Sequence, residues 1–194
     1  SLEAQIGNEN FVLNATETTV NPTENGYKVC VVTPQHTNEY EAAQVISTVG
    51  AYALPHLLPF LSEQDLAPLV NLEYAKVIQV IVGYENWTGV DIKAFGGLVP
   101  TVEQKDILGV LFTSSFFENR APQNGALLSI FIGGVKKPHL FNLTDDELKQ
   151  LVDKHLKEMM KVNLAEAAFV SINRYEHAIP QYTVTSGERF AAIE

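Results

Sequence analysis

The sequence predicts an α+β fold: a mixed, mainly antiparallel sheet with a few helices on one face, and a smaller β-rich part near the N-terminus. Runs rich in β-branched residues follow one another through the middle of the chain with no long helix between them, which favours antiparallel pairing. An Asn-Gly pair near the N-terminus indicates a hairpin. One strongly amphipathic helix comes after these strands and supplies an apolar surface to cover the sheet.

The N-terminal part reads as a β-hairpin or short meander. Apolar runs at residues 11–13 and 27–32 flank the turn signal Asn25-Gly26. A polar segment follows, and then the apolar run Ala42–Val49, which is compatible with a buried strand. Pro55 and Pro59 follow and indicate a boundary between two domains.

The middle of the chain predicts a short helix and then three strands. Ser62 begins a Ser-x-x-acid capping box, so a helix is expected from there to about Val70. Strands are expected at Lys76–Tyr84, Asp106–Phe117 and Ala126–Ile132, because each run is apolar and bounded by turn residues. Strands that follow one another in this way suggest an antiparallel sheet.

A second capping box begins the longest predicted helix. Thr144 and Glu147 have the required spacing, and three acidic residues lie in the first turn, where the helix dipole favours them. Apolar residues then recur at helical spacing and form one stripe, which is expected to pack on the sheet. The stripe comprises Leu148, Leu151, Val152, Leu156, Met159 and Met160. A last strand is expected at Ala167–Ile172.

Composition limits the classes of partner. The chain has 194 residues, of which 46% are hydrophobic, enough to bury a core. Its formal net charge of -10 argues against nucleic acid and anionic lipid, which bind basic surfaces. No run reaches the roughly 18 apolar residues of a transmembrane helix, so none is expected. The single cysteine excludes an intramolecular disulfide and fits a reducing compartment.

The sequence shows no catalytic constellation and no metal site. Its twelve glycines never form the Gly-x-Gly-x-x-Gly loop that would hold a dinucleotide phosphate. Its five histidines lack metal-ligand spacing and have no cysteine cluster to join. Ser114 and Ser115 lack a nucleophile elbow, and the acids at 145–147 are explained by their place at a helix start.

One pattern suggests a ligand slot. Side chains alternate between the two faces of a strand. This predicts one face with Ile107, Gly109 and Leu111 in the first strand, and one face with Leu127, Ser129 and Phe131 in the second. The small residues Gly109 and Ser129 would leave a flat apolar slot, suited to a large planar or saucer-shaped ligand. Taken alone, the pattern favours ordinary core packing over a ligand slot.

Several runs of the chain resemble the flavin-dependent protoporphyrinogen oxidase family, in the same order and at nearly the same spacing. They are Phe95–Pro100 (FGGLVP), Ile107–Phe117, Asn119–Pro122 (NRAP) and Ser129–Gly134 (SIFIGG), joined by Gly50–Pro55 and Ala178–Tyr182. The resemblance covers essentially the whole chain. It implies a parent enzyme that oxidises protoporphyrinogen IX to protoporphyrin IX in haem biosynthesis, using FAD and oxygen. A cofactor carries that chemistry while the protein orients the substrate.

The resemblance also implies how the chain is divided. Residues 1–55 look like the β-rich middle segment of the FAD-binding domain, and residues 56–194 look like a segment of the substrate-binding domain. The N-terminal glycine loop, the helical membrane domain and the C-terminal flavin segment are not in this sequence. The chain is therefore expected to be an inactive piece that does not retain FAD. Its expected partners are the porphyrinogen and the missing domains, in a cytoplasmic parent peripheral to the membrane.

The resemblance implies binding roles for four residues. Leu98 and Leu111 match the apolar residues on one side of the tetrapyrrole, and Phe131 matches the position facing the other side of the ring. Glu17 aligns with a residue whose backbone meets the flavin adenine. Three alternatives remain: a coproporphyrinogen III oxidase of the same family, another flavin amine oxidase, and a non-enzymatic module that binds a hydrophobic ligand.

Overall fold

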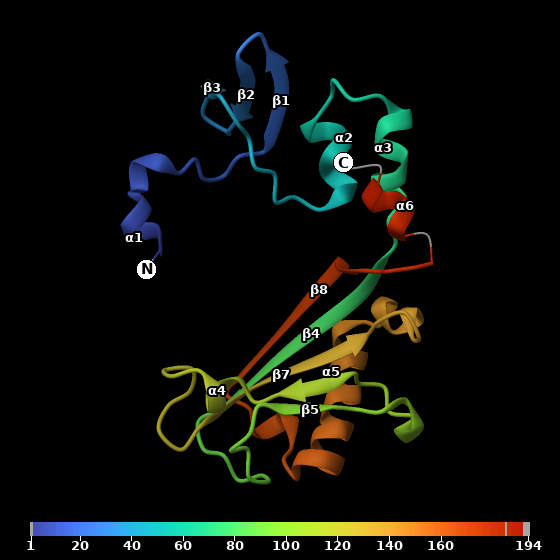
Figure 1. The fold of residues 1–194 in the computed structure, drawn as a ribbon. Coiled ribbons are helices and arrows are strands. Elements are labelled where there is room, and N and C mark those ends of the chain that lie inside the picture. Colours follow the sequence, from blue (N-terminus) through green and yellow to red (C-terminus); the bar gives the residue numbers. More distant parts are fainter. Residues whose placement is uncertain (1, 185, 192–194) are drawn as a thin grey trace. The chain divides into compact units, whose positions relative to one another are not determined.

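The structure is a computed structural model that describes residues 2–184 and 186–191. The chain forms two compact units, one of Ser1–Leu72 with Tyr182–Glu194 and the other of Glu73–Gln181 (Figure 1). The division falls at Leu72 and Glu73, further along the chain than the expected boundary at residue 55. The end of the chain also returns to the first unit. Assignment of these units to FAD-binding and substrate-binding domains stays a prediction.

The first unit contains a small antiparallel sheet in the order β1-β2-β3, with strands Glu17–Thr23, Gly26–Val32 and Thr37–Ala42. The hairpin predicted at Asn25-Gly26 is confirmed, since β1 and β2 pair from Glu17 opposite Val32 to Thr23 opposite Gly26. Only glycine fits at position 26, because a Cβ there would lie 2.3 Å from the Ala42 carbonyl oxygen. The first strand begins later than expected, and Phe11 to Leu13 are exposed and outside any strand.

The strand expected at Ala42–Val49 is wrong. Only Ala42 belongs to a strand, and the following residues are irregular and mostly exposed. The third strand instead comes from the polar segment before it, Thr37–Ala42, in which four of the six residues are exposed and none is buried. Pairing with β2 stabilises a strand that has no hydrophobic signature. The helices of this unit are α1 (Leu2–Ile6), η1 (Asn8–Asn10), η2 (Ala51–Ala53), α2 (Leu54–Leu57), α3 (Glu63–Val70) and α6 (Ser186–Ala191).

The second unit is built on an antiparallel sheet in the order β5-β6-β7-β4-β8, which confirms the predicted fold class. The strands are β4 (Tyr74–Tyr84), β5 (Gly96–Leu98), β6 (Gly109–Leu111), β7 (Ala126–Gly133) and β8 (Phe169–Pro180). The long strand expected at Asp106–Phe117 is wrong in extent. After Leu111 the chain forms the helical turn α4 (Thr113–Phe116), where the Ser114 hydroxyl accepts a hydrogen bond from Leu127 N at 3.0 Å.

Helix α5 (Asp145–His155) covers one face of this sheet (Figure 1). The predicted capping box is confirmed, since Thr144 Oγ1 accepts from Glu147 N and the Glu147 carboxylate accepts from Thr144 N. A π-helical turn, η5 (Leu156–Met160), continues the helix. The apolar stripe packs on the sheet as predicted, against the even-numbered residues of β4 and β7. The short 3-10 helices of this unit are η3 (Thr101–Glu103), η4 (Pro138–Asn142) and η6 (Leu164–Glu166).

The two faces of the sheet differ in burial. The helix side carries fully buried residues such as Ile78, Val80 and Ile130. The other side carries the odd-numbered residues of β4 and β7, many of them only partly buried, and is called the open face below. Ile107, expected on the open face, lies in the core on the helix side beside Val152, because β6 begins only at Gly109.

Candidate functional site

The open face brings Leu98 and Phe131 into one cross-strand row. Leu98 pairs with Gly109, Gly109 pairs with Phe131, and Phe131 pairs with Gln79. Paired residues of neighbouring strands project to the same side of a sheet. Asn173 of β8 continues the row beyond Gln79. The row therefore runs across all five strands, with its apolar residues on β5 and β7.

Leu111 lies in the next row of the same face. It pairs with Ser129, which pairs with Ile81. Residues two apart along a strand are separated by roughly 6.8 Å, so Leu111 is one step from the row of Leu98 and Phe131. The structure thus gathers the three residues expected to bind substrate on one side of one sheet.

Gly109 determines how closely β5 and β6 approach on this face. A Cβ at Gly109 would lie 2.7 Å from the Gly97 carbonyl oxygen and 3.1 Å from Leu98 Cδ2. The side chain of Leu98 therefore fills the space left by the missing side chain. Leu98 is nevertheless 83% exposed, whereas Leu111 and Phe131 are partly buried. The result is a shallow apolar shelf that a large flat ligand could cover.

A chain of hydrogen bonds crosses the middle of the open face. Ser129, 6% exposed, shares a hydrogen bond of 3.1 Å with Thr113 and accepts one of 3.5 Å from Gln79 Nε2. The Tyr175 hydroxyl donates to Gln79 Oε1 at 3.4 Å. Hydroxyl and amide groups of this kind can orient a ligand by hydrogen bonding. Sequence reasoning missed Gln79, although a polar residue inside a β-branched run was an available signal.

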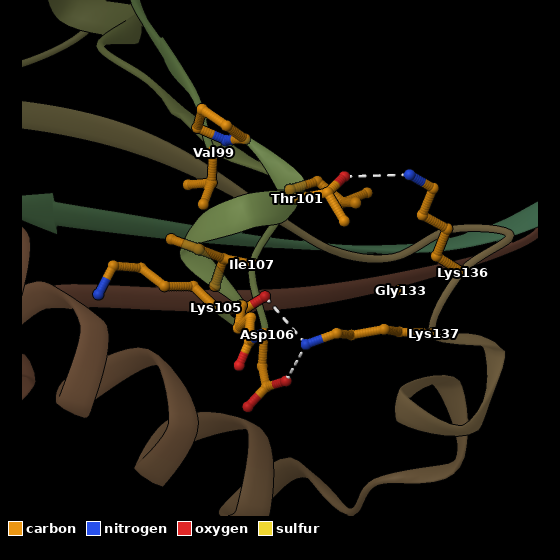
Figure 2. A pocket seen from close by; sticks show the side chains of 11 residues that line it. Val99, Thr101, Lys105, Asp106, Ile107, Gly133, Lys136 and Lys137 are labelled. Carbon is orange, nitrogen blue, oxygen red and sulfur yellow. Dashed lines mark hydrogen bonds and ion pairs between the residues drawn. The ribbon is translucent and has the colours of Figure 1, made fainter.

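A cavity of about 80 Å³ lies where β5 ends and β6 begins (Figure 2). Its lysines are engaged: Lys137 Nζ donates to Asp106 Oδ1 and to the Lys105 carbonyl oxygen, and Lys136 Nζ donates to Thr101 Oγ1 at 3.0 Å. The hydrogen bond from Lys137 lowers the pKa of Asp106. This cavity is too small for a tetrapyrrole, and its charges are already satisfied.

Glu17, expected to meet the flavin adenine through its backbone, lies at the start of β1 in the first unit. Its side chain is exposed, and β1 is an edge strand paired only with β2, so alternate backbone groups of β1 point away from the sheet. Glu17 belongs to the first unit, whereas Leu98, Leu111 and Phe131 belong to the second. The sequence has no glycine loop of the kind that binds a dinucleotide phosphate at a helix N-terminus.

The described part of the chain holds neither a membrane-spanning helix nor a cluster of metal-binding side chains. Among residues 2–184 and 186–191, no helix is long and apolar enough to span a bilayer. Over the same residues, no three side chains of the metal-binding types cluster closely enough to hold an ion.

Comparison with known proteins identifies the family. Residues 1–191 match the family described as flavin containing amine oxidoreductase. The chain therefore belongs to this family. Its fold agrees with that of reduced UDP-galactopyranose mutase, with a TM-score of 0.74 at 12% identity over 98% of this chain and 40% of the other.

Two curated relatives are named as porphyrinogen oxidases. The chloroplastic protoporphyrinogen oxidase of Nicotiana tabacum is 30% identical over 167 residues, covering 82% of this chain and 30% of the relative. The coproporphyrinogen III oxidase of Propionibacterium freudenreichii is 31% identical over 88 residues, covering 45% of this chain and 16% of the relative. The chain thus spans less than a third of the length of these relatives.

Proposed function

We propose that this chain supplies the substrate-binding sheet of an FAD-dependent protoporphyrinogen oxidase, which oxidises protoporphyrinogen IX to protoporphyrin IX with oxygen as the final acceptor. The observation that carries the proposal is the gathering of Leu98, Leu111 and Phe131 on one open face. Similarity to the tobacco protoporphyrinogen oxidase supports the choice of substrate.

The chemistry of the face suits this role. A porphyrinogen is a broad, largely apolar ring, and an apolar shelf with a few polar groups is the usual form of such a site. The bound flavin would supply the redox chemistry by accepting hydride from the substrate. The residues of this chain need only hold and orient the ring and exclude water. Leu98, Leu111 and Phe131 would contact the ring, and Gln79 and Ser129 would offer hydrogen bonds near it.

The isolated chain would not hold FAD or oxidise porphyrinogen. Phosphate binding in such proteins depends on a glycine loop at a helix N-terminus, and this sequence has none. The backbone at Glu17 would contact the adenine only when the remaining FAD-binding segments are present. Those segments are the proposed partners of the chain.

A coproporphyrinogen is the second candidate substrate. The relative from Propionibacterium freudenreichii is named for it and matches 45% of this chain. Coproporphyrinogen differs from protoporphyrinogen in its peripheral side chains, of which more carry a carboxylate. The ring itself is the same, so the apolar shelf would bind either substrate. Discrimination would depend on cationic groups at the margin of the shelf.

The test is a fluorescence titration of the purified chain with protoporphyrin IX. We expect saturable binding that Leu111→Ala and Phe131→Ala each weaken about tenfold, since truncating a contacting apolar side chain removes about 1.5 kcal/mol. Phe60→Ala, in the first unit, is the matched control, because Phe60 is also partly exposed. Circular dichroism confirms that each variant is folded. Binding that ignores both substitutions, or no binding by the folded chain, contradicts the proposal.

A parallel sample with added FAD tests the incomplete flavin site. We expect no saturable change in flavin fluorescence or absorbance. Tight, stoichiometric FAD binding by this chain would contradict the assignment of its first unit as a partial FAD-binding domain.

A further inference from the structure

Gln79 is a polar residue within a long run of apolar ones in β4. Its neighbours Ile78 and Val80 are fully buried on the helix side of the sheet. Gln79 itself projects to the open face, where it pairs with Phe131 of β7 on one side and with Asn173 of β8 on the other. Directly opposite residues of neighbouring strands have Cβ atoms about 4.5–5.5 Å apart. The amide therefore adjoins Phe131, one of the three residues of the apolar shelf.

Two hydrogen bonds set the orientation of this amide. The Tyr175 hydroxyl donates to Gln79 Oε1 at 3.4 Å, and Gln79 Nε2 donates to Ser129 Oγ at 3.5 Å. These partners turn the amide nitrogen toward β7 and the carbonyl oxygen toward β8. Both bonds are longer than the usual range of about 2.7–3.2 Å, so they direct the amide weakly and leave it open to a further partner.

The carbonyl oxygen of Gln79 can accept a second hydrogen bond. An amide oxygen carries two lone pairs, and among the described residues Oε1 accepts one hydrogen bond, from Tyr175. Gln79 is half-buried, so a ligand that covers the open face would shield the other lone pair from water. An acceptor that is buried without a partner costs free energy. A ligand that presents an N–H group at this point is therefore favoured over one that does not.

Oxidation of a tetrapyrrole changes the hydrogen-bonding groups of its ring. Every pyrrole nitrogen of a porphyrinogen carries a hydrogen, whereas half of the nitrogens of a porphyrin are imine nitrogens that only accept. The porphyrinogen ring is also puckered, so its N–H groups can point out of the mean plane toward a surface beneath it. The porphyrin ring is flat and holds its N–H groups within the plane. A carbonyl oxygen beneath the ring therefore pairs with the porphyrinogen and not with the porphyrin.

We propose that Gln79 is a specificity-determining residue: its Oε1 accepts a hydrogen bond from a pyrrole N–H, and the open face therefore binds porphyrinogen more tightly than porphyrin. The inference rests on the proposed function, because it takes the ring to lie on the shelf. Neighbouring strands are roughly 4.8 Å apart, so Gln79 lies one strand from Phe131 and within the breadth of a bound ring. The apolar residues hold the ring in either oxidation state, and Gln79 distinguishes the two. Tighter binding of the substrate than of the product would help the oxidised ring to leave.

The experiment measures both ligands on the purified chain in the absence of oxygen. Protoporphyrin IX is titrated directly by its fluorescence, and protoporphyrinogen IX, which does not fluoresce, is titrated as a competitor that displaces it. Gln79→Met keeps the length of the side chain but removes the acceptor. It should weaken protoporphyrinogen binding about fivefold, as expected for one lost hydrogen bond, and change protoporphyrin binding by less than about twofold. Gln150→Met is the matched control, because Gln150 is exposed on α5, which covers the opposite face.

Gln79→Glu separates the role of the acceptor from that of packing. Glutamate keeps an oxygen acceptor at the same place, so this variant should retain the preference for porphyrinogen that Gln79→Met loses. Both ligands carry the same carboxylates, so the ratio of their two dissociation constants cancels the effect of the added charge. Circular dichroism confirms folding, and Ser129 keeps its hydrogen bond of 3.1 Å to Thr113 when Gln79 is replaced.

The outcomes separate this inference from the proposed function. If the folded chain binds neither ring, both are overturned. If Phe131→Ala weakens binding of the rings but the wild type binds them equally, or Gln79→Met leaves the ratio of the two dissociation constants unchanged, only the role of Gln79 is overturned. The same holds if Gln79→Glu loses the preference as fully as Gln79→Met. A preference that is lost in Gln79→Met and kept in Gln79→Glu supports the inference.

Discussion

Leu98 and Phe131 face the same side of the sheet across Gly109, which pairs with both of them. These residues are 33 positions apart in sequence, and β5, β6 and β7 bring them into one row. The absence of a side chain at Gly109 leaves room for Leu98, whose Cδ2 would lie 3.1 Å from a Cβ on Gly109. Gly109, which has no side chain, is therefore part of the proposed substrate shelf together with Leu98 and Phe131.

Gly109→Ala should therefore destabilise the chain by about 1–3 kcal/mol, the usual cost of overpacking. The added Cβ would lie 2.7 Å from the Gly97 carbonyl oxygen, so β5 has to move. Gly97→Ala is the matched control, since a Cβ there has no atom within 4 Å. Urea denaturation measures both. Equal stability of the two variants would show that β5 moves aside without cost.

Leu98→Ala should affect ligand binding and not stability. Leu98 is 83% exposed, so its truncation should change the free energy of unfolding by less than about 0.5 kcal/mol. Loss of its contact with the ring should weaken protoporphyrin binding about fivefold, equivalent to about 1 kcal/mol. Val102→Ala is the control, since Val102 is 82% exposed but lies in η3, outside the shelf. Identical titration curves for Leu98→Ala and the wild type would remove Leu98 from the site.

Thr144→Ala should lower stability by about 1 kcal/mol through loss of the α5 cap. Thr144 Oγ1 accepts from Glu147 N at 3.3 Å, and this amide has no other partner in the first turn of the helix. Chemical denaturation of the variant measures the effect. The exposed loop residue Thr88 is the control, and Thr88→Ala should change stability by less than about 0.5 kcal/mol.

His155→Leu should stabilise the chain. The ring is only 4% exposed, and neither of its nitrogens has a hydrogen-bond partner among the described residues. A buried polar group without a partner costs about 1–3 kcal/mol, and leucine at this position would join the core under α5. Thermal unfolding at neutral pH measures the gain. A lower melting temperature would mean that the ring is satisfied in a way that leucine cannot replace.

The same residue should make stability depend on pH. Burial lowers the pKa of His155, opposed by Glu158 and assisted by Lys105. The unfolded chain therefore binds a proton on this histidine more readily than the folded chain. The free energy of unfolding is therefore unaffected by this titration above the ordinary histidine pKa of about 6.5. It decreases as the pH falls below that value, because protonation then favours the unfolded chain. Urea midpoints from pH 7.5 to pH 5 should fall less steeply in His155→Leu than in the wild type.

Local sequence signals correctly predicted the features that depend on contacts between residues close together in the sequence. The capping boxes at Ser62 and Thr144 predicted two helix starts correctly, because each is closed by atoms within four residues. The turn at Asn25-Gly26 and the β-branched run of β4 were likewise correct. The signals failed for β3, a polar strand stabilised by its partner, and for Ala42–Val49, an apolar run that does not form a strand.

The sequence by itself determined the fold class and, through its resemblance to a known family, named Leu98, Leu111 and Phe131. Only the tertiary structure decided that they share one face, that Ile107 lies on the other, and that Gln79 lies beside Phe131 on the open face. The physical reason is that a strand's register and a loop's anchoring depend on contacts between segments far apart in the chain. Alternation gives the face of a residue only after its partners are known.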